Sequence, residues 1–262
     1  HTLEQEYGMK LFDLKDKKWV LTPAGQAVHA VALTMKHHDS MLRMALQQMA
    51  KNEEHIVIGA TLTIGIYLLP DIIADFLKDD PSTQIRLIIA DTQELLKKLD
   101  AQEINFAFVE GFVPQNEYET RAYSREPFIG VCAADYPLHC SFCYLEDLLE
   151  ERLLLRERGS GSRKLLERCL QRRNLQISDF HSQMEINNLD TLKNLTQRGC
   201  GITLLFERAV QEELRRGTLK KIPIKDFSIG HDFTFLWGKD STFAGRYESF
   251  FQIALNHKNK KP

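Results

Sequence analysis

The sequence lacks an apolar run of the roughly 20 residues that a membrane-spanning helix needs, and no signal peptide is recognisable in it. It also lacks an excess of basic residues, because 34 lysines and arginines are balanced by 36 acidic residues, for a formal net charge of -2. This balance argues against a generally basic, non-specific nucleic-acid binder, so any affinity for nucleic acid must be local to one part of the chain. We expect a cytoplasmic protein without a membrane partner.

Cysteine is scarce as well. The five cysteines are an odd number spread through the chain, at Cys132, Cys140, Cys143, Cys169 and Cys200. This distribution suits a reduced cytosolic protein better than a disulfide framework. Cys140 and Cys143 form a C-x-x-C pair, but no second pair of ligands at a suitable spacing completes a tetrahedral metal site. We therefore expect ordinary small side chains there, and neither a metal ion nor a cofactor.

A hairpin that leads into a helix is predicted near the start of the chain. Apolar residues 11–12 and 19–21 form its two arms. The polar connection between the arms carries three lysines, Lys15, Lys17 and Lys18. Thr22 then offers an N-cap oxygen, and Pro23 suits the first helical position because its missing N–H breaks no hydrogen bond there. The helix should begin at this point.

The helix that follows carries a stripe of residues at alternating spacings of three and four, as in a heptad repeat. The stripe consists of Val28, Val31, Met35, His38, Leu42, Ala45 and Met49. Such a seam buries one side of a helix against another helix, so we expect dimerisation through this segment. A helix packed on its own domain is the alternative.

Downstream of a polar segment at residues 52–55, strand-like apolar runs alternate with helical patterns. The predicted strands are residues 56–60, 85–90 and 104–109, with helices at 67–78 and 92–101, and the pattern restarts at 128–132 as a second lobe. This alternation implies an α/β fold with a parallel sheet. The strand ends, at residues 61–63, 91–92 and 110–111, should line one edge, which is where ligands bind in open α/β sheets.

A glycine- and serine-rich turn in the second lobe is the strongest local binding motif. Residues 156–163, with the sequence RERGSGSR, open a helix predicted from Lys164 to Arg173. Gly159 and Gly161 relax the backbone, so that exposed N–H groups and two hydroxyl groups can meet an anionic or carboxylate-bearing ligand. A plain strand-to-helix turn capped by serine is the alternative.

Four stretches of the sequence resemble the LysR-type transcriptional regulators. Residues 3–27 combine LEQEYGMKLF, a short basic hairpin and LTPAGQA, and later stretches read IGATLTIGIYLLP, LRERGSGSR and NNLDTLKNLTQRGCGITLL. The resemblance implies that residues 1–22 are the end of a winged helix-turn-helix DNA-binding domain and that residues 23–54 are a linker and dimerisation helix. Residues 55–258 would then be a two-lobed, periplasmic-binding-protein-like (type II) effector domain. Lobe one would take about 55–126 and 227–258, and lobe two about 127–226.

The same resemblance implies a DNA-binding transcriptional regulator whose C-terminal domain senses a small anionic metabolite. Its partners would be a double-stranded DNA operator, a small-molecule effector and further copies in a homodimer or homotetramer. The lysines Lys15, Lys17 and Lys18 would contact the DNA backbone. Because residues 3–7 are only the last turns of a recognition helix, we expect this polypeptide by itself to bind DNA poorly. The expected ligand-binding residues are Thr61, Thr63, Thr92, Gly159, Ser160, Gly161, Ser162, Arg163 and Asn188.

Two other classes of protein share a two-lobed fold. A solute-binding receptor would need an export signal and would have no reason to carry the hairpin and the heptad helix. A two-lobed enzyme, such as a small dehydratase, would need convergent acid, base or nucleophile groups. Asp91, Glu110 and His231 are the candidates, but nothing in the sequence places a base beside a nucleophile. We therefore expect no catalytic activity.

The seam makes a prediction about assembly. Leu42→Asp would place charges in the middle of the apolar stripe, so it should weaken the dimer. Sedimentation of the parent chain and the variant measures this effect. A parent chain that sediments as a monomer would show that the heptad interpretation is wrong.

Overall fold

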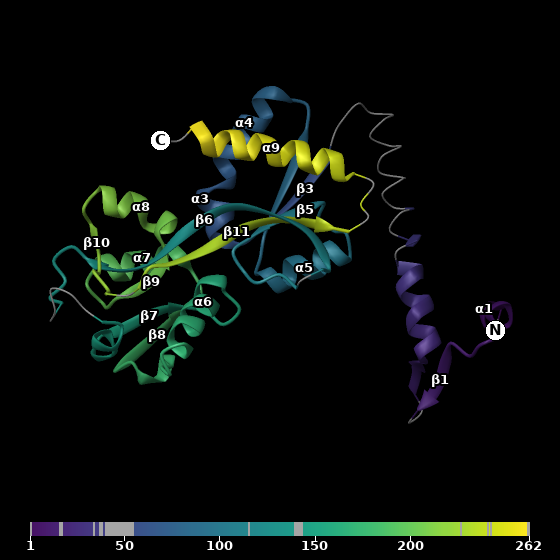
Figure 1. Ribbon diagram of the computed structural model, residues 1–262, viewed down its shortest axis with the longest axis horizontal. Helices are drawn as coiled ribbons and strands as arrows, with labels where there is room; N and C mark the ends of the chain where they lie inside the picture. Colours follow the sequence, from purple (N-terminus) through teal and green to yellow (C-terminus); the bar gives the residue numbers. More distant parts are fainter. Residues whose placement is uncertain are drawn as a thin grey trace. The chain divides into compact units, whose positions relative to one another are not determined.

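The structure, a computed structural model, describes residues 2–15, 18–33, 35–36, 39, 55–114, 116–138, 144–225, 227–239, 241 and 243–260. Its contacts divide the chain into two units, His1–His55 and Ile56–Pro262, and each is described by itself. Figure 1 shows the first unit in purple and the second in the colours from blue to yellow.

The first unit contains the predicted hairpin. A short helix, α1 (Thr2–Tyr7), is followed by the antiparallel strands β1 (Phe12–Lys15) and β2 (Lys18–Leu21). The strands extend further than expected, because Lys15 and Lys18 lie in the strands as partners, and Lys17 is outside the described residues. The Glu4 carboxylate accepts the backbone N–H of Leu11 at 2.8 Å, which fastens α1 to the hairpin.

The helix that follows begins where predicted. Its described residues are 23–33, 35–36 and 39. Thr22 Oγ1 accepts the N–H of Gly25 at 3.0 Å, which confirms the N-cap. Of the predicted seam, Val31 and Met35 are 55% and 66% exposed. The seam positions His38, Leu42, Ala45 and Met49 lie outside the described residues, so dimerisation stays a prediction.

A seven-stranded sheet runs through the second unit in the order β10-β6-β11-β5-β3-β4, with β9 also paired to β6. Its strands are β3 (His55–Ala60), β4 (Gln84–Ile89), β5 (Phe106–Val109), β6 (Tyr118–Ala133), β9 (Thr203–Phe206), β10 (Leu219–Lys221) and β11 (Ile229–Gly238). β3 and β5 are parallel, whereas β11 is antiparallel to both β5 and β6. The sheet is therefore mixed: the parallel pairing predicted for the first strands is confirmed for β3 and β5, whereas β11 pairs in the opposite direction.

β6 and β11 are the long strands that connect the two lobes of this unit (Figure 1). Their pairing runs from Tyr118 opposite Gly238 to Phe128 opposite Ile229. The sequence analysis identified only residues 128–132 of β6, because residues 119–121 and 125 are polar or charged and carry no apolar strand pattern. Their strand conformation depends on a partner about 100 residues later in the chain.

Each lobe adds helices to its part of the sheet, and lobe two also adds two strands of its own. Lobe one has α3 (Leu62–Tyr67), α4 (Leu69–Asp79), α5 (Thr92–Asp100) and α9 (Ala244–Lys260), with α4 and α9 above its strands and α5 below them in Figure 1. Lobe two has η1 (Glu146–Glu150), β7 (Arg152–Arg156), α6 (Gly161–Gln171), η2 (Ile177–Asp179), β8 (Ser182–Ile186), α7 (Leu189–Gln197) and α8 (Glu207–Arg215). The strands β7 and β8 pair with each other in parallel in a separate two-stranded sheet. No helix in the described ranges is long and apolar enough to cross a membrane.

Aromatic side chains fill the core of lobe one. Phe235 of β11 lies 5.1 Å from Phe106 and 4.8 Å from Phe108, measured between ring centroids. On the helix side it stacks on Phe251 of α9 at 5.0 Å. These fully or nearly buried rings hold α9 on the sheet, which keeps the strand ends of lobe one in a fixed arrangement.

Two helix starts differ from the sequence prediction. The helix expected at residues 67–78 is α4, which begins at Leu69, and the preceding α3 was not predicted; Leu68 departs from helical geometry between them, and Pro70 lies in the first turn of α4. α3 already starts at Leu62, and α6 starts at Gly161 rather than Lys164. Residues 61–63 and 160–163 are therefore helix starts and not loops.

Candidate functional site

The carboxyl ends of strands from both lobes meet around one cavity of about 180 Å³. Lobe one supplies residues that follow β3, β4 and β5, and lobe two supplies residues that follow β7 and β8. The lining residues are Thr61, Leu62, Ile89, Ala90, Asp91, Glu110, Arg156, Glu157, Ser160, Gly161 and Asn187. This is the sheet edge at which the sequence predicted a ligand.

Glu110 connects the two lobes at this cavity. It follows β5 in lobe one and is only 3% exposed; its backbone N–H donates to Thr61 Oγ1 at 3.2 Å, and the hydroxyl groups of Thr63 in its own lobe and Ser162 in lobe two favour its charged form. A Cβ atom at Gly161 would lie 2.6 Å from Glu110 Cγ, so only glycine fits at this helix start. The carboxyl group of lobe one is therefore packed directly against the first turn of α6 in lobe two.

Burial governs the protonation of Glu110. It raises the pKa of this carboxyl to about 7, although the hydroxyl groups and the nearby Arg156 guanidinium favour the charged form. Its Oε2 atom is buried and has no hydrogen-bond partner among the described residues. Near neutral pH the carboxyl is thus present in both protonation states.

Arg156 lies on the lobe-two side of the cavity, at the end of β7, and is 5% exposed. Its Nε and Nη2 atoms donate to the Glu157 carboxylate at 2.8 and 2.7 Å. The third nitrogen, Nη1, is buried without a partner in the part of the chain that the structure describes. A buried guanidinium N–H of this kind can donate to an acceptor held in the cavity.

Asp91 lies on the opposite, lobe-one side of the cavity, at its exposed rim. Its Oδ1 atom caps α5 by accepting the N–H of Glu94 at 2.9 Å. Its Oδ2 atom lies 3.5 Å from the position that a Cβ would take at Gly159, whose φ of +102° favours glycine. Asp91 and the turn before α6 thus approach each other across the cavity.

The structure brings together some of the residues predicted to bind the ligand. Thr61, Ser160 and Gly161 line the cavity, while Thr63 and Ser162 contact Glu110 behind it. Gly159 forms the adjoining turn. That these residues contact a ligand remains a prediction.

The other predicted residues point elsewhere. The Arg163 guanidinium donates to the backbone oxygen of Arg156 at 3.0 Å and pairs with Glu167 and Glu185, so its charge is already neutralised within lobe two. Asn188 caps α7 through the N–H of Thr191, and its neighbour Asn187 lines the cavity instead.

Thr92 is also placed away from the cavity. It is buried, and its Oγ1 atom would lie 2.1 Å from a Cβ at Gly111, so it packs against the chain that follows β5. Arg156, Glu157 and Asn187 were not predicted. The only signal for the first two was a pair of opposite charges at a strand end, directly before the glycine- and serine-rich turn.

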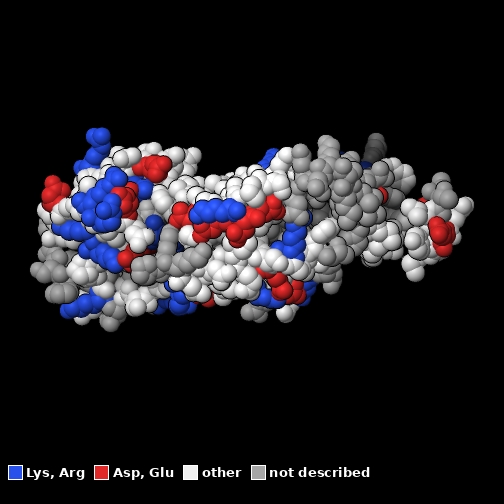
Figure 2. Space-filling view, turned by 90° about the horizontal axis from the view of Figure 1, so that it is seen from above, with Lys and Arg blue, Asp and Glu red and all other residues white. Residues whose placement is uncertain are grey.

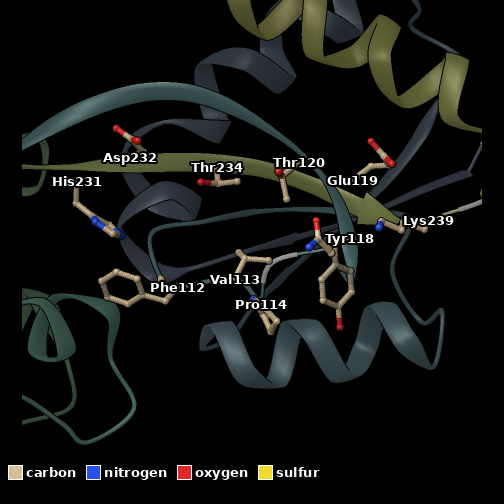
Figure 3. Close-up of a pocket in the computed structure, with 12 residues that line it drawn as sticks. Phe112, Val113, Pro114, Tyr118, Glu119, Thr120, His231, Asp232, Thr234 and Lys239 are labelled. Carbon is tan, nitrogen blue, oxygen red and sulfur yellow. The ribbon is translucent and has the colours of Figure 1, made fainter.

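A second, larger groove of about 630 Å³ lies between the segment after β5 and the strands β6 and β11 (Figure 3). Figure 3 shows Phe112 and His231 next to each other at one end, with ring centroids 4.8 Å apart. The Arg168 guanidinium of α6 lies 3.1 Å from the Phe112 ring centroid, which adds a second contact between the lobes. Burial lowers the pKa of His231.

Metal binding has no candidate in this region. Among the described residues, no group of three or more histidine, cysteine or acidic side chains is arranged to hold a metal ion. Cys140 and Cys143 lie outside the described residues.

Two α/β lobes joined by paired crossing strands, with a polar cavity between them, define a two-lobed small-molecule-binding domain of the periplasmic-binding-protein type. Residues 50–259 match the family model of the LysR substrate binding domain. The chain belongs to the LysR family of transcriptional regulators. It is accordingly a ligand-sensing regulator and not an enzyme.

Individual relatives agree with this assignment. The chain is 27% identical to the HTH-type transcriptional regulator YeiE of Escherichia coli K12 over 223 residues, which cover 85% of this chain and 74% of YeiE. It is 26% identical over 260 residues to the RuBisCO operon transcriptional regulator of Allochromatium vinosum, with 97% and 83% covered. The regulatory domain of Synechocystis PCC6803 CcmR, solved in complex with 2-PG, has the same fold, with a TM-score of 0.70 at 16% identity over 80% of this chain and 99% of that domain.

Glu110 makes a prediction about pH. The pKa of Glu110 is raised from 4.5 to about 7 on folding, so protonation of this carboxyl favours the native state. The resulting gain in the free energy of unfolding is fully present below pH 4.5 and is lost as the pH rises through 7. At about 1.4 kcal/mol for each pH unit, the loss is about 3 kcal/mol. The neutral amide of Glu110→Gln should remove this dependence. Urea unfolding of both proteins between pH 5 and pH 8 measures it.

Glu248→Gln is the matched control, because Glu248 is a half-exposed carboxylate paired with Arg121. It should follow the pH dependence of the parent chain. Parallel curves for Glu110→Gln and the parent chain would contradict the raised pKa.

Proposed function

We propose that the cavity between the lobes is the effector site of this regulator, and that the N-terminal hairpin is a wing that contacts DNA. The observation that carries the ligand proposal is the pair of buried atoms without partners at one cavity, Arg156 Nη1 and Glu110 Oε2. Buried polar atoms without partners are costly, and a polar ligand would offset that cost. The complex of the CcmR regulatory domain with 2-PG supports a small-molecule effector for this fold.

The effector should carry an acidic group. Arg156 Nη1 and the first N–H groups of α6 lie on the same side of the cavity, and both favour an acceptor with negative charge. The hydroxyl groups of Thr61 and Ser160 can donate to it without adding a counter-charge.

The organisation of the chain follows from this function. Residues 1–22 would be the end of the DNA-binding domain, 23–54 the dimerisation helix, and 55–258 the effector domain. A homodimer or homotetramer would place several DNA-binding regions on a partly palindromic operator. In Figure 2 basic side chains gather mainly toward the left end of the face and adjoin acidic side chains in its middle.

The effector would act through the arrangement of the lobes. Because it touches both lobes, its affinity differs between closed and open arrangements, and only that difference can shift the equilibrium of the regulator. A change in the relative position of the lobes would pass through strands β6 and β11, since both strands extend through both lobes.

Thr61 provides a test of the cavity. Thr61→Val removes one hydroxyl donor from the lining, so it should weaken the binding of a metabolite found by thermal-shift screening by about 1 to 3 kcal/mol. Calorimetry gives the affinity. Thr203→Val is the matched control, because Thr203 is a buried threonine in β9 outside the cavity lining. Equal affinities in both variants would place the effector elsewhere.

The DNA-binding proposal is tested in a protein that carries this chain with a complete winged helix-turn-helix. Lys17→Ala combined with Lys18→Ala should weaken binding to all DNA fragments about equally and reduce the salt slope by about 2, as expected for two phosphate contacts. Fluorescence anisotropy at several salt concentrations measures both effects. Lys78→Ala, an exposed lysine in lobe one, is the control. A loss confined to one operator base would contradict a backbone role.

A further inference from the structure

We infer that the effector is a small zwitterion, with a carboxylate and an ammonium group on one molecule as in a free amino acid. The inference rests on the proposed function, since it specifies the ligand of the cavity between the lobes. It follows from the charges that line this cavity and from the two buried atoms that lack partners there.

Acidic groups outnumber basic groups around the cavity. Its ionisable lining residues are Asp91, Glu110, Glu157 and Arg156. Arg156 and Glu157 neutralise each other through two hydrogen bonds. Among the described residues, no basic side chain is hydrogen-bonded in this way to the carboxyl groups of Asp91 and Glu110, and Arg156 acts on Glu110 through its charge, so a ligand with negative charge alone would lie close to like charges.

The excess of acid is confined to one side. Asp91 and Glu110 belong to lobe one, where β4 and β5 end, and Glu110 Oε2 is buried without a partner among the described residues. An ammonium group has three N–H donors and a positive charge, so it can donate to this oxygen, favour the ionised form of Glu110 and compensate for both carboxylates. A hydroxyl group could donate once but would leave the charge uncompensated.

Lobe two presents the opposite chemistry. Arg156 Nη1 is buried without a partner in the described part of the chain, and the N–H groups of Gly161 and Ser162 lie in the first turn of α6, where helices leave N–H groups free. All of these groups donate hydrogen bonds. A carboxylate accepts several of them at once, so the negative end of the ligand belongs on lobe two.

The cavity is small, at about 180 Å³, and Leu62, Ile89 and Ala90 complete its wall. A ligand with one short side chain beside its two charged groups fits this lining. By binding lobe one with its ammonium group and lobe two with its carboxylate, such a ligand stabilises the closed arrangement of the lobes.

The larger groove in Figure 3 does not share this chemistry. Its acidic residues Glu119 and Asp232 pair with Arg121 and Arg125, at 3.5 and 3.3 Å. Asp232 therefore offers a matched control for a charge change outside the cavity.

The first experiment separates the two charged groups of the ligand. Thermal unfolding of the chain is measured with each of the 20 standard amino acids, and every amino acid that raises the midpoint is compared with its 2-hydroxy acid and its decarboxylated amine. We expect at least one amino acid to bind, and both analogues to need at least tenfold higher concentrations for the same shift. A 2-hydroxy acid that binds as tightly as its amino acid, or a panel without a binding amino acid, overturns the inference.

The second experiment places the ammonium group. Asp91→Asn keeps the helix cap, since asparagine caps as well as aspartate, but removes the charge. It should weaken the amino acid at least tenfold, whereas Asp232→Asn should leave its affinity unchanged. The reverse pattern would assign the ligand to the larger groove and overturn the inference. If an anion without an amine binds, and Thr61→Val weakens that binding, the effector is not a zwitterion. The proposed effector site would still stand in that case.

Discussion

The contact between a buried carboxyl and a helix start is the constraint on which the arrangement of the lobes depends. Glu110 extends from the end of β5 in lobe one and meets Ser162 and Gly161 of α6 in lobe two. The approach is possible only because Gly161 has no side chain, and burial removes the water that would otherwise solvate the carboxyl. The lobes are thus held together by a group whose charge is sensitive to its surroundings, so a ligand that changes those surroundings also changes the contact.

This arrangement gives the cavity opposite character on its two sides. Lobe one contributes carboxyl groups at the ends of β4 and β5, and lobe two contributes Arg156 and the first turn of α6. Neither lobe alone can satisfy both ends of a polar ligand. A ligand that binds both sides favours the closed arrangement of the lobes over the open one by the difference in its affinity for the two. Sensing then requires no separate mobile element. The aromatic core around Phe235 keeps the strands of lobe one fixed while this occurs.

Local signals in the sequence predicted much of this fold. The N-cap at Thr22 was correct because capping depends on a few neighbouring residues. The first half of β6 was missed, since its polar residues form a strand only when paired with β11, far along the chain. The same limit applies to the cavity: hydroxyl groups at helix starts were visible in the sequence, but the convergence of Glu110, Arg156 and Asp91 depends on how the lobes meet. Arg163 was assigned to the ligand although its spacing of four residues from Glu167 already favoured an ion pair within the helix, whereas its second partner, Glu185, is brought near only by the fold.

The most direct test of the central claim is a crystal structure of the chain grown with the metabolite that raises its unfolding temperature most. We predict electron density for that molecule between Asp91 and Arg156, in contact with Glu110 and with the first turn of α6. Density in the groove beside Phe112 and His231, with the cavity between the lobes unchanged, would contradict the account.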